Sequence, residues 1–93
     1  MAEEIKASHI LVETEAEAIS LKEEILSGKS FEDVAAENSL CPSGANGGDL
    51  GFFGRGQMVS EFENAAFDLN IGEISDPVRT NFGWHLIVVT EKA

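Results

Sequence analysis

Two segments at opposite ends of the chain have the two-residue periodicity of β-strands, and they constrain the fold most. They are Ile5–Val12, which reads IKASHILV, and Gly83–Thr90, which reads GWHLIVVT. Successive side chains of a strand point to opposite faces, so every second residue shares a face. We therefore predict a first and a last strand, with His9 and His85 each on a face whose other residues are apolar.

Between the two predicted strands, the sequence contains residues that typically begin helices. Thr14 and Glu17 form a capping box, and Ser30 is a second N-cap, before apolar residues at helical spacing. A further capping box of Ser60 and Glu63 begins a third helix. The expected helices cover Glu15–Ser27, Phe31–Asn38 and Ser60–Asn70.

Two shorter strands are expected as well. One surrounds Leu50–Phe53 within the glycine-rich stretch 41–58, and the other covers Ile74–Thr80. Pro77 has no N–H for a strand ladder, so the second of these belongs at a sheet edge. A few strands with helices around them predict an α+β fold with one sheet, and 93 residues leave room for a single domain, residues 1–93.

The charge of the chain excludes several classes of partner. Seventeen acidic and six basic residues give a net charge of −11, which repels nucleic acid and anionic membrane surfaces. The longest apolar run, Leu86–Val89, is too short to span a membrane, and the N-terminus has no leader-like pattern. A single cysteine cannot form an internal disulfide, so we expect a cytoplasmic protein. The chain from Met1 to the last strand is also expected to be complete and free-standing.

His9, His85 and Cys41 are the candidates for chemistry. If the first and last strands are antiparallel neighbours, the two imidazoles can pair across the sheet, one donating and the other accepting a hydrogen bond. Several interpretations stay open: hydrogen-bonded core histidines with a small buried cysteine, a thiol hydrolase built from Cys41 and one histidine, or a zinc site. The zinc interpretation lacks any CxxC or HxxxH spacing that presents two ligands from one turn.

Four segments together resemble the parvulin family of peptidyl-prolyl cis/trans isomerases. They are ASHILV, SLCPSG, GGDLGFFGRGQMVSEFENAAFDL and GEISDPVRTNFGWHLIVV, in this order. The resemblance covers Ile5 to Glu91, and its GGDLGFFGRGQM and FGWHLI segments are the most specific. It implies the parvulin fold of the FKBP-like superfamily, with a four-stranded, largely antiparallel sheet surrounded by four helices.

The resemblance also implies roles for residues of this chain. His9 and His85 match the paired sheet histidines of the family, and Cys41 matches a position that is cysteine or aspartate. Ser43 and Thr80 match hydroxyl positions close to the reacting peptide bond, so these five residues are the expected catalytic set. The implied apolar wall around the substrate proline consists of Leu50, Met58, Phe62 and Phe82.

The implied reaction is rotation about a peptide bond, which breaks no bond and needs no cofactor and no metal. A dry apolar pocket favours the twisted amide over the more polar planar form, and the Cys/His/His network would act without covalent attack. The expected partners are proline-containing peptides and unfolded or folding proteins, bound by a monomer. The main alternative is a non-catalytic module that binds such segments as a chaperone.

The loop after the first strand indicates which X-Pro bonds are preferred. Phosphoprotein-directed parvulins carry a basic cluster there, whereas this chain reads VETEAEA. Because three glutamates repel a phosphate group, the predicted substrates have an unphosphorylated, apolar residue before proline.

Overall fold

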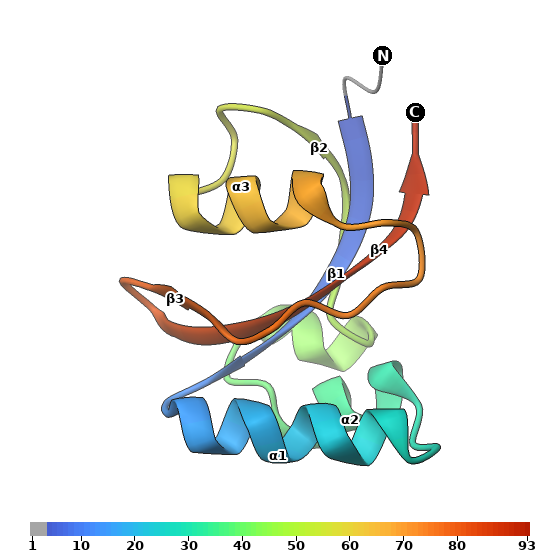
Figure 1. Cartoon of the computed structure of the whole chain (residues 1–93), viewed down its shortest axis with the longest axis vertical. Helices are drawn as coiled ribbons and strands as arrows, with labels where there is room; N and C mark the ends of the chain where they lie inside the picture. Colours follow the sequence, from blue (N-terminus) through green and yellow to red (C-terminus); the bar gives the residue numbers. More distant parts are fainter. Residues whose placement is uncertain (1–3) are drawn as a thin grey trace.

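A four-stranded sheet organises the fold (Figure 1). The computed structural model describes residues 4–93, so the first three residues of the predicted domain lie outside it. The strands are β1 (Glu4–Val12), β2 (Asp49–Gly54), β3 (Val78–Thr80) and β4 (Gly83–Lys92). Their spatial order is β2-β1-β4-β3, and every neighbouring pair is antiparallel. The predicted first and last strands are confirmed, and they pair with each other at the centre of the sheet.

Three α-helices and one 3-10 helix surround the sheet. They are α1 (Glu15–Leu26), α2 (Phe31–Asn38), α3 (Ser60–Asp68) and the 3-10 helix η1 (Pro42–Asn46). Helices α1 and α2 lie on one side of the sheet and α3 lies on the other (Figure 1). The α+β class is confirmed. The fourth helix implied by the resemblance is the short η1, which Pro42 opens and Gly47 ends in the left-handed region.

Alternation along the central strands divides the buried residues into two clusters. Ile10, Val12 and Leu86 belong to the cluster under α1 and α2. The cluster under α3 contains Ile5, Ala7, Phe53, Phe62, Ala66, Leu69, Ile87 and Val89. Because His9 and His85 are two residues from Ala7 and Ile87, both histidines face the α3 side, and each shares its face with apolar residues as the sequence predicts.

The predicted caps of the first two helices are confirmed. The Thr14 hydroxyl accepts the N–H of Glu17 at 3.2 Å, and the Ser30 hydroxyl accepts the N–H of Asp33 at 3.2 Å. The capping box predicted for Ser60 and Glu63 is wrong, because Val59 is the N-cap residue of α3 and makes no side-chain cap bond.

The carboxylate of Glu63, which the predicted capping box with Ser60 requires, binds other groups instead. Glu63 accepts the backbone N–H of Gly56 and the guanidinium of Arg55, which fixes the loop before α3 to the helix. The helix also ends at Asp68, two residues before the predicted Asn70.

The strand predicted over Ile74–Thr80 is shorter than expected. Only Val78–Thr80 forms β3, and Ile74 contributes a single bridge to Val88. Pro77 lies between these two contacts, and its missing N–H prevents a continuous ladder. The predicted position at a sheet edge is confirmed, because β3 is the outermost strand beside β4.

Candidate active site

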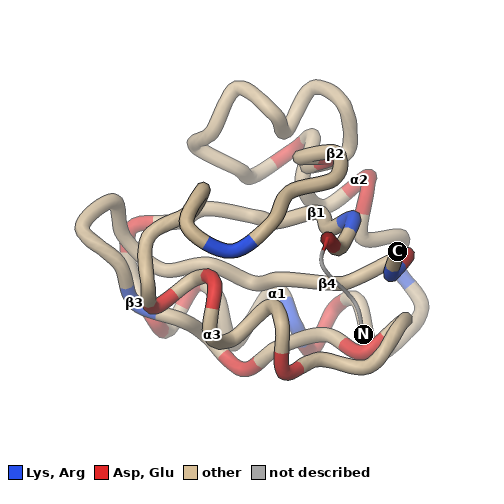
Figure 2. The backbone as a smooth tube through the Cα atoms, turned by 90° about the horizontal axis from the view of Figure 1, so that it is seen from above, with Lys and Arg blue, Asp and Glu red and all other residues tan. Residues whose placement is uncertain are grey.

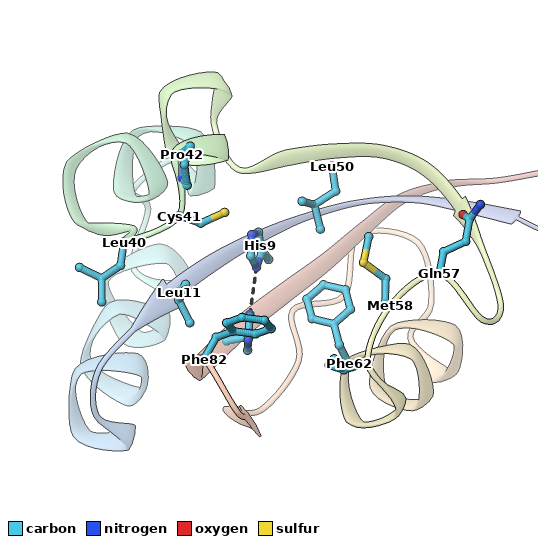
Figure 3. A pocket seen from close by; sticks show the side chains of 12 residues that line it. His9, Leu11, Leu40, Cys41, Pro42, Leu50, Gln57, Met58, Phe62 and Phe82 are labelled. Carbon is cyan, nitrogen blue, oxygen red and sulfur yellow. Dashed lines mark hydrogen bonds between the residues drawn. The ribbon is translucent and has the colours of Figure 1, made fainter.

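A cleft of about 510 Å³ opens on the α3 side of the sheet (Figure 3). Its lining comes from β1, β2, β4, the start of α3, η1 and the connections α2–η1, β2–α3 and β3–β4, and is predominantly apolar. The lining residues are His9, Leu11, Leu40, Cys41, Pro42, Leu50, Gln57, Met58, Val59, Phe62, Phe82 and His85. The cleft thus brings together all the predicted site residues except Ser43 and Thr80.

The strand register places the two histidines side by side. Leu11 of β1 is opposite His85, and His9 is opposite Ile87, so the histidines are diagonal neighbours on adjacent strands. Their Nδ1 atoms are 2.9 Å apart, and their stacked rings have centroids 5.1 Å apart. Both side chains are buried. This is the pairing across the sheet that the sequence predicts.

Hydrogen bonds extend from both ends of the histidine pair. The Thr80 hydroxyl oxygen lies 2.7 Å from Nε2 of His85, and the Ser43 hydroxyl oxygen lies 3.2 Å from Nε2 of His9. Ser43 donates in turn to Sγ of Cys41 at 3.2 Å. Thr80, His85, His9, Ser43 and Cys41 therefore form one hydrogen-bonded series, which we call the polar row. Ser43 and Thr80 hold the outer ring nitrogens of the histidines instead of lining the cleft.

One direction of donation satisfies every member of the polar row. Because the Ser43 hydroxyl donates to Cys41, its oxygen accepts from Nε2–H of His9. Nδ1 of His9 then carries no proton and accepts from Nδ1–H of His85. Nε2 of His85 accepts in turn from the Thr80 hydroxyl. In this arrangement both imidazoles are neutral.

Burial of the two imidazoles favours their neutral forms. It lowers the pKa of His9, and the neighbouring His85 lowers it further, to about 4. Burial also lowers the pKa of His85. Protonation of His9 would place a charge in a largely apolar cleft and would bring two Nδ1–H groups face to face. The hydrogen bond between the rings therefore requires the neutral pair.

Three apolar residues form a wall on one side of the histidine pair, and Figure 3 shows them as Leu50, Met58 and Phe62. Phe62 projects from the first turn of α3, and its ring makes edge contacts with both imidazoles. The centroid of the Phe62 ring lies 5.6 Å from that of the His9 ring and 5.3 Å from that of the His85 ring. The apolar wall and the polar row are therefore in direct contact.

Phe82 lies in the β3–β4 turn and lines the same cleft (Figure 3). Its backbone N–H donates to the Thr80 hydroxyl oxygen at 3.1 Å, which ties this turn to the polar row. Its side chain is 70% exposed. The four residues implied as one proline-binding wall thus all line the same cleft.

Five lining residues are absent from the predicted site. They are Leu11, Leu40, Pro42, Gln57 and Val59. Leu11 had a usable signal, because it shares a strand face with His9. Leu40, Gln57 and Val59 lie in connecting segments and Pro42 opens the short η1, so no periodicity indicates the direction of their side chains.

Cys41 is a free thiol that is separated from the histidines by Ser43. Among residues 4–93, no hydrogen bond joins its sulfur to an imidazole. A thiol nucleophile is normally activated by a base within hydrogen-bond reach, so this geometry does not favour the thiol hydrolase. Within the same residues, no three His, Cys, Asp or Glu side chains are grouped to hold a metal ion.

Gly48 links the two halves of the polar row through its backbone. Its carbonyl accepts the N–H of His9 at 2.9 Å, and its own N–H donates to the carbonyl of Ser43 at 2.8 Å. Its φ of 84° lies in the left-handed region, and an added Cβ would overlap the carbonyl oxygen of His9. Glycine at this position therefore sets how closely Ser43 approaches His9.

If the cleft isomerises X-Pro bonds, as the resemblance implies, we expect Gly48→Ala to lower kcat/KM for an X-Pro peptide by about 10- to 100-fold, because His9 and Ser43 must move apart. The matched control is Gly51→Ala, since Gly51 has a φ of 72° and no atom within 4 Å of an added Cβ. The NMR signal of the proton between the two Nδ1 atoms should shift or vanish only in the Gly48 variant. Equal activity and equal spectra for the two variants would contradict this positioning role.

The fold is a four-stranded antiparallel sheet, and the site is an apolar cleft with a histidine pair in its floor. Together with the similarity to solved parvulins, they indicate the class of parvulin-type peptidyl-prolyl isomerases. The chain belongs to the PPIC-type PPIASE domain family, whose sequence model matches residues 1–93. The resemblance that the sequence motifs carry is therefore confirmed.

Individual relatives agree with this assignment. The foldase protein PrsA of Geobacillus kaustophilus is 53% identical over 89 residues, which are 95% of this chain and 32% of that protein. A crystal structure of PrsA from Bacillus anthracis has a TM-score of 0.96 and 49% identity, and the match covers 99% of this chain and 43% of that one. NmPin, the parvulin of Nitrosopumilus maritimus, has a TM-score of 0.88 and 42% identity, covering 97% of this chain and 98% of NmPin. The chain thus spans about a third of the curated foldase and nearly all of NmPin.

Proposed function

We propose that this domain catalyses cis/trans isomerisation of X-Pro bonds without covalent chemistry. The observation that carries the proposal is the direct contact between the apolar wall and the polar row inside one cleft. A cleft of about 510 Å³ has room for a proline ring and the residue beside it. Isomerisation needs both surfaces, because the ring is apolar and the rotating amide is polar.

The apolar wall favours the transition state through desolvation. Amide resonance makes the barrier to rotation ~18–20 kcal/mol, and the twisted amide loses much of that resonance. Water stabilises the polar planar amide more than the twisted one, so a site lined by Leu50, Met58 and Phe62 reduces the difference. The proline ring packs against this wall while the preceding carbonyl rotates over the polar row.

The polar row supplies fixed dipoles near the bond that rotates. As the amide twists, electron density returns to the proline nitrogen, and pre-oriented dipoles stabilise this change. We assign this role to Cys41 and the two histidines. Ser43 and Thr80 act on the same bond by holding the outer nitrogens of the imidazoles.

We expect Cys41→Asp to keep kcat/KM within about threefold of the parent, because a carboxylate also accepts the Ser43 hydrogen bond. Cys41→Ala removes the acceptor and should cost about tenfold. Both variants are measured with the same X-Pro peptide, and intact-protein mass spectrometry checks for adducts with it. A trapped covalent adduct would show that Cys41 is a nucleophile, and loss of activity in Cys41→Asp as large as in Cys41→Ala would contradict the acceptor role given to it.

The surroundings of the cleft favour an unphosphorylated substrate. The connection from β1 to α1 carries Glu13 and leads into Glu15, and Figure 2 shows that basic segments are few. Arg55, the basic residue of the glycine-rich stretch, forms an ion pair with Glu63 at 3.3 Å and covers the Phe67 ring at 4.4 Å. The residues that line the cleft also include no Lys or Arg, so a phosphate group before proline would meet no cation among them.

A Ser-Pro peptide should accordingly be isomerised at least about tenfold faster than its phosphoserine twin at low ionic strength, since like charges repel at close range. Both rates are measured by exchange NMR with one protein sample, and added salt should narrow the difference. Faster turnover of the phosphorylated peptide would overturn the proposed preference.

We propose unfolded or folding proteins as the natural partners of the domain. The relatives named foldases support this, although each is about three times as long as this chain. A binding module without catalysis would use the same cleft, but it would not need the fully satisfied polar row that this chain has. We therefore prefer catalysis to passive binding.

A monomeric state, a cytoplasmic location and a single domain over residues 1–93 stay predictions from the sequence. In the part of the chain that the structure describes, no helix has the length and apolar composition to cross a membrane. One similar structure, 40% identical, is described in connection with SurA-like chaperones that include the periplasmic protein Cj1289 of Campylobacter jejuni. Light scattering of the purified protein tests the monomer, and fractionation of the source cells tests the location.

A further inference from the structure

The sheet extends beyond α1 and α2, which leaves part of one face uncovered by these helices (Figure 1). Where the helices cover this face, Ile10, Val12 and Leu86 are at most 1% exposed. Farther along it, Ser8 and Val88 are only partly buried. A second hollow, of about 440 Å³, lies here, on the face opposite to the two histidines. We call it the far groove, and its lining residues are Lys6, Ser8, Phe31, Glu32, Asn46, Asp49, Val88, Thr90 and Glu91.

A half-exposed aromatic ring stands beside the far groove. Phe52 of β2 is the register partner of Lys6, which lines the groove. Because Phe53 packs under α3, the neighbouring Phe52 points to the groove side of the sheet, where it is 48% exposed. Val88 adds apolar surface from β4, opposite Ser8. Apolar surface that gathers at a groove marks an interaction site, unlike single scattered residues.

The outer edge of β2 is not open to an added strand. β2 is the outermost strand beside β1, and an unpaired strand edge can bind an extended peptide through its backbone. Here the N–H of Gly51 donates to Oδ1 of Asp49 and that of Gly54 donates to Oε1 of Gln57, both at 2.8 Å. These two backbone donors are already used, so a ligand is expected on the face of the sheet.

The acidic side chains of the far groove outnumber its cation. Lys6 forms an ion pair with Glu91 at 3.6 Å. Among residues 4–93, no salt bridge involves Glu32 or Asp49. The whole chain has a net charge of −11, so the field around these two carboxylates attracts cationic groups.

Both unpaired carboxylates are held in place. Asp49 is fixed by the N–H of Gly51. The stem of Glu32 lies against Gly47 at the end of η1, because a Cβ added to Gly47 would come within 2.7 Å of Cγ of Glu32. A pre-organised surface loses little conformational entropy when a ligand binds, which suits a recognition site.

We infer that the far groove binds a polypeptide segment in which Lys or Arg residues flank an apolar side chain. The cations meet Glu32 and Asp49, and the apolar side chain packs between Phe52 and Val88. This inference goes beyond the proposed isomerase function, because the far groove and the cleft lie on opposite faces of the sheet. A folding protein can therefore be held in the groove while an X-Pro bond occupies the cleft.

The test titrates isotope-labelled protein with a proline-free peptide, Gly-Lys-Leu-Lys-Leu-Lys-Gly, and follows the backbone amide signals by NMR. We expect shifts at Lys6, Phe52 and Val88, and none at the residues of the cleft. Twin peptides with Glu for Lys, or Ser for Leu, should bind at least about fivefold more weakly. Raising the ionic strength to about 0.15 M, where the Debye length is about 8 Å, should weaken binding about threefold.

Two groove variants separate the charges from the apolar surface. The double variant Glu32→Gln, Asp49→Asn removes both charges, and an amide oxygen at position 49 still accepts the N–H of Gly51. It should weaken binding of the Lys peptide by about 3- to 10-fold. Phe52→Thr keeps strand propensity, removes the ring and should weaken binding by a similar factor.

Matched controls lie on α1, away from the far groove. Glu15→Gln, Glu23→Gln removes the same charge from exposed positions, and Ile19→Thr removes an apolar side chain that is 46% exposed. Both controls should bind the Lys peptide within about twofold of the parent. Circular dichroism checks that all four variants are folded.

The outcomes separate the far groove from the isomerase. Parent-like affinity in both groove variants, equal binding of the Glu peptide, or shifts centred on the cleft would overturn the inference. Groove signals that change with protein concentration alone would overturn it in favour of a second copy of this chain. Isomerisation of a short Leu-Pro peptide should stay within about twofold in the groove variants and in the presence of the Lys peptide. A parent that binds the Lys peptide in the groove without accelerating isomerisation would contradict the proposed function alone.

Discussion

Replacing Phe62 by alanine is expected to remove about 3–5 kcal/mol of stability and to lower kcat/KM more than about 100-fold. The Phe62 side chain is 4% exposed, and its ring contacts both imidazoles and also Phe53, whose centroid is 6.1 Å away. Its loss leaves a cavity in the cluster under α3 and removes the part of the apolar wall that touches the polar row. Urea unfolding measures the first effect, and exchange NMR on the folded fraction measures the second.

Phe67→Ala is the matched control for this prediction. Phe67 lies on the same helix and contacts Phe53 with centroids 6.1 Å apart, but it does not line the cleft. We expect it to cost less stability, about 1–3 kcal/mol, because its side chain is only partly buried. Its activity per folded molecule should stay within about threefold of the parent. Equal loss of activity in the two variants would contradict the role given to Phe62.

Acidification from pH 7 to pH 4 is expected to destabilise the protein by about 2–3 kcal/mol through the histidine pair. The pKa of folded His9 is about 4, and that of folded His85 is also below the ordinary value of 6.5. The unfolded chain therefore binds more protons than the folded one between about pH 6.5 and pH 4. The histidine contribution to the free energy of unfolding is fully present above pH 6.5 and is lost as the pH drops through this window.

The histidine contribution can be isolated because His9 and His85 are the chain's two histidines. Urea unfolding at several pH values is compared between the parent and the double variant His9→Gln, His85→Gln. The double variant keeps the acidic residues, so their contribution to the pH dependence is common to both proteins. We expect a steeper loss of stability on acidification in the parent, and parallel curves would show that the histidines do not carry the effect.

The existence of the two central strands and the faces of their side chains could be predicted because both faces of these strands are buried. Side-chain alternation in Ile5–Val12 assigns His9 to one side of the sheet and Ile10 to the other, and the structure has this arrangement. The caps at Thr14 and Ser30 were also predictable, since each depends on residues within one helical turn.

Features that depend on distant contacts could not be predicted in this way. Phe62 and Phe67 are about 140° apart around their helix, which predicts that they serve different faces. Both nevertheless contact Phe53, because that large ring lies under α3 within reach of both side chains. The capping box at Ser60 failed for a similar reason, since Glu63 binds the preceding loop.

In the candidate site, too, some features could be predicted from the sequence and others could not. Residue types and spacing left a thiol hydrolase and a zinc site open, and the family resemblance supplied the polar and apolar residues. Two contacts between separate segments could not be read from the sequence. Ser43 lies between Cys41 and His9, and the N–H of Leu40 donates to the carbonyl of Leu11 at the rim of the cleft. Hydrogen bonds between separate segments fix both arrangements, and no local pattern records them.

The most direct test of the account is cis/trans exchange of a short Leu-Pro peptide, followed by NMR with and without the protein. Unaided exchange of an X-Pro bond takes tens to hundreds of seconds. We predict that micromolar protein brings the exchange into the subsecond range, as cross-peaks between the cis and trans signals, and that Phe62→Ala largely abolishes them. Binding of the peptide without any acceleration would contradict catalysis and identify the domain as a proline-peptide-binding module.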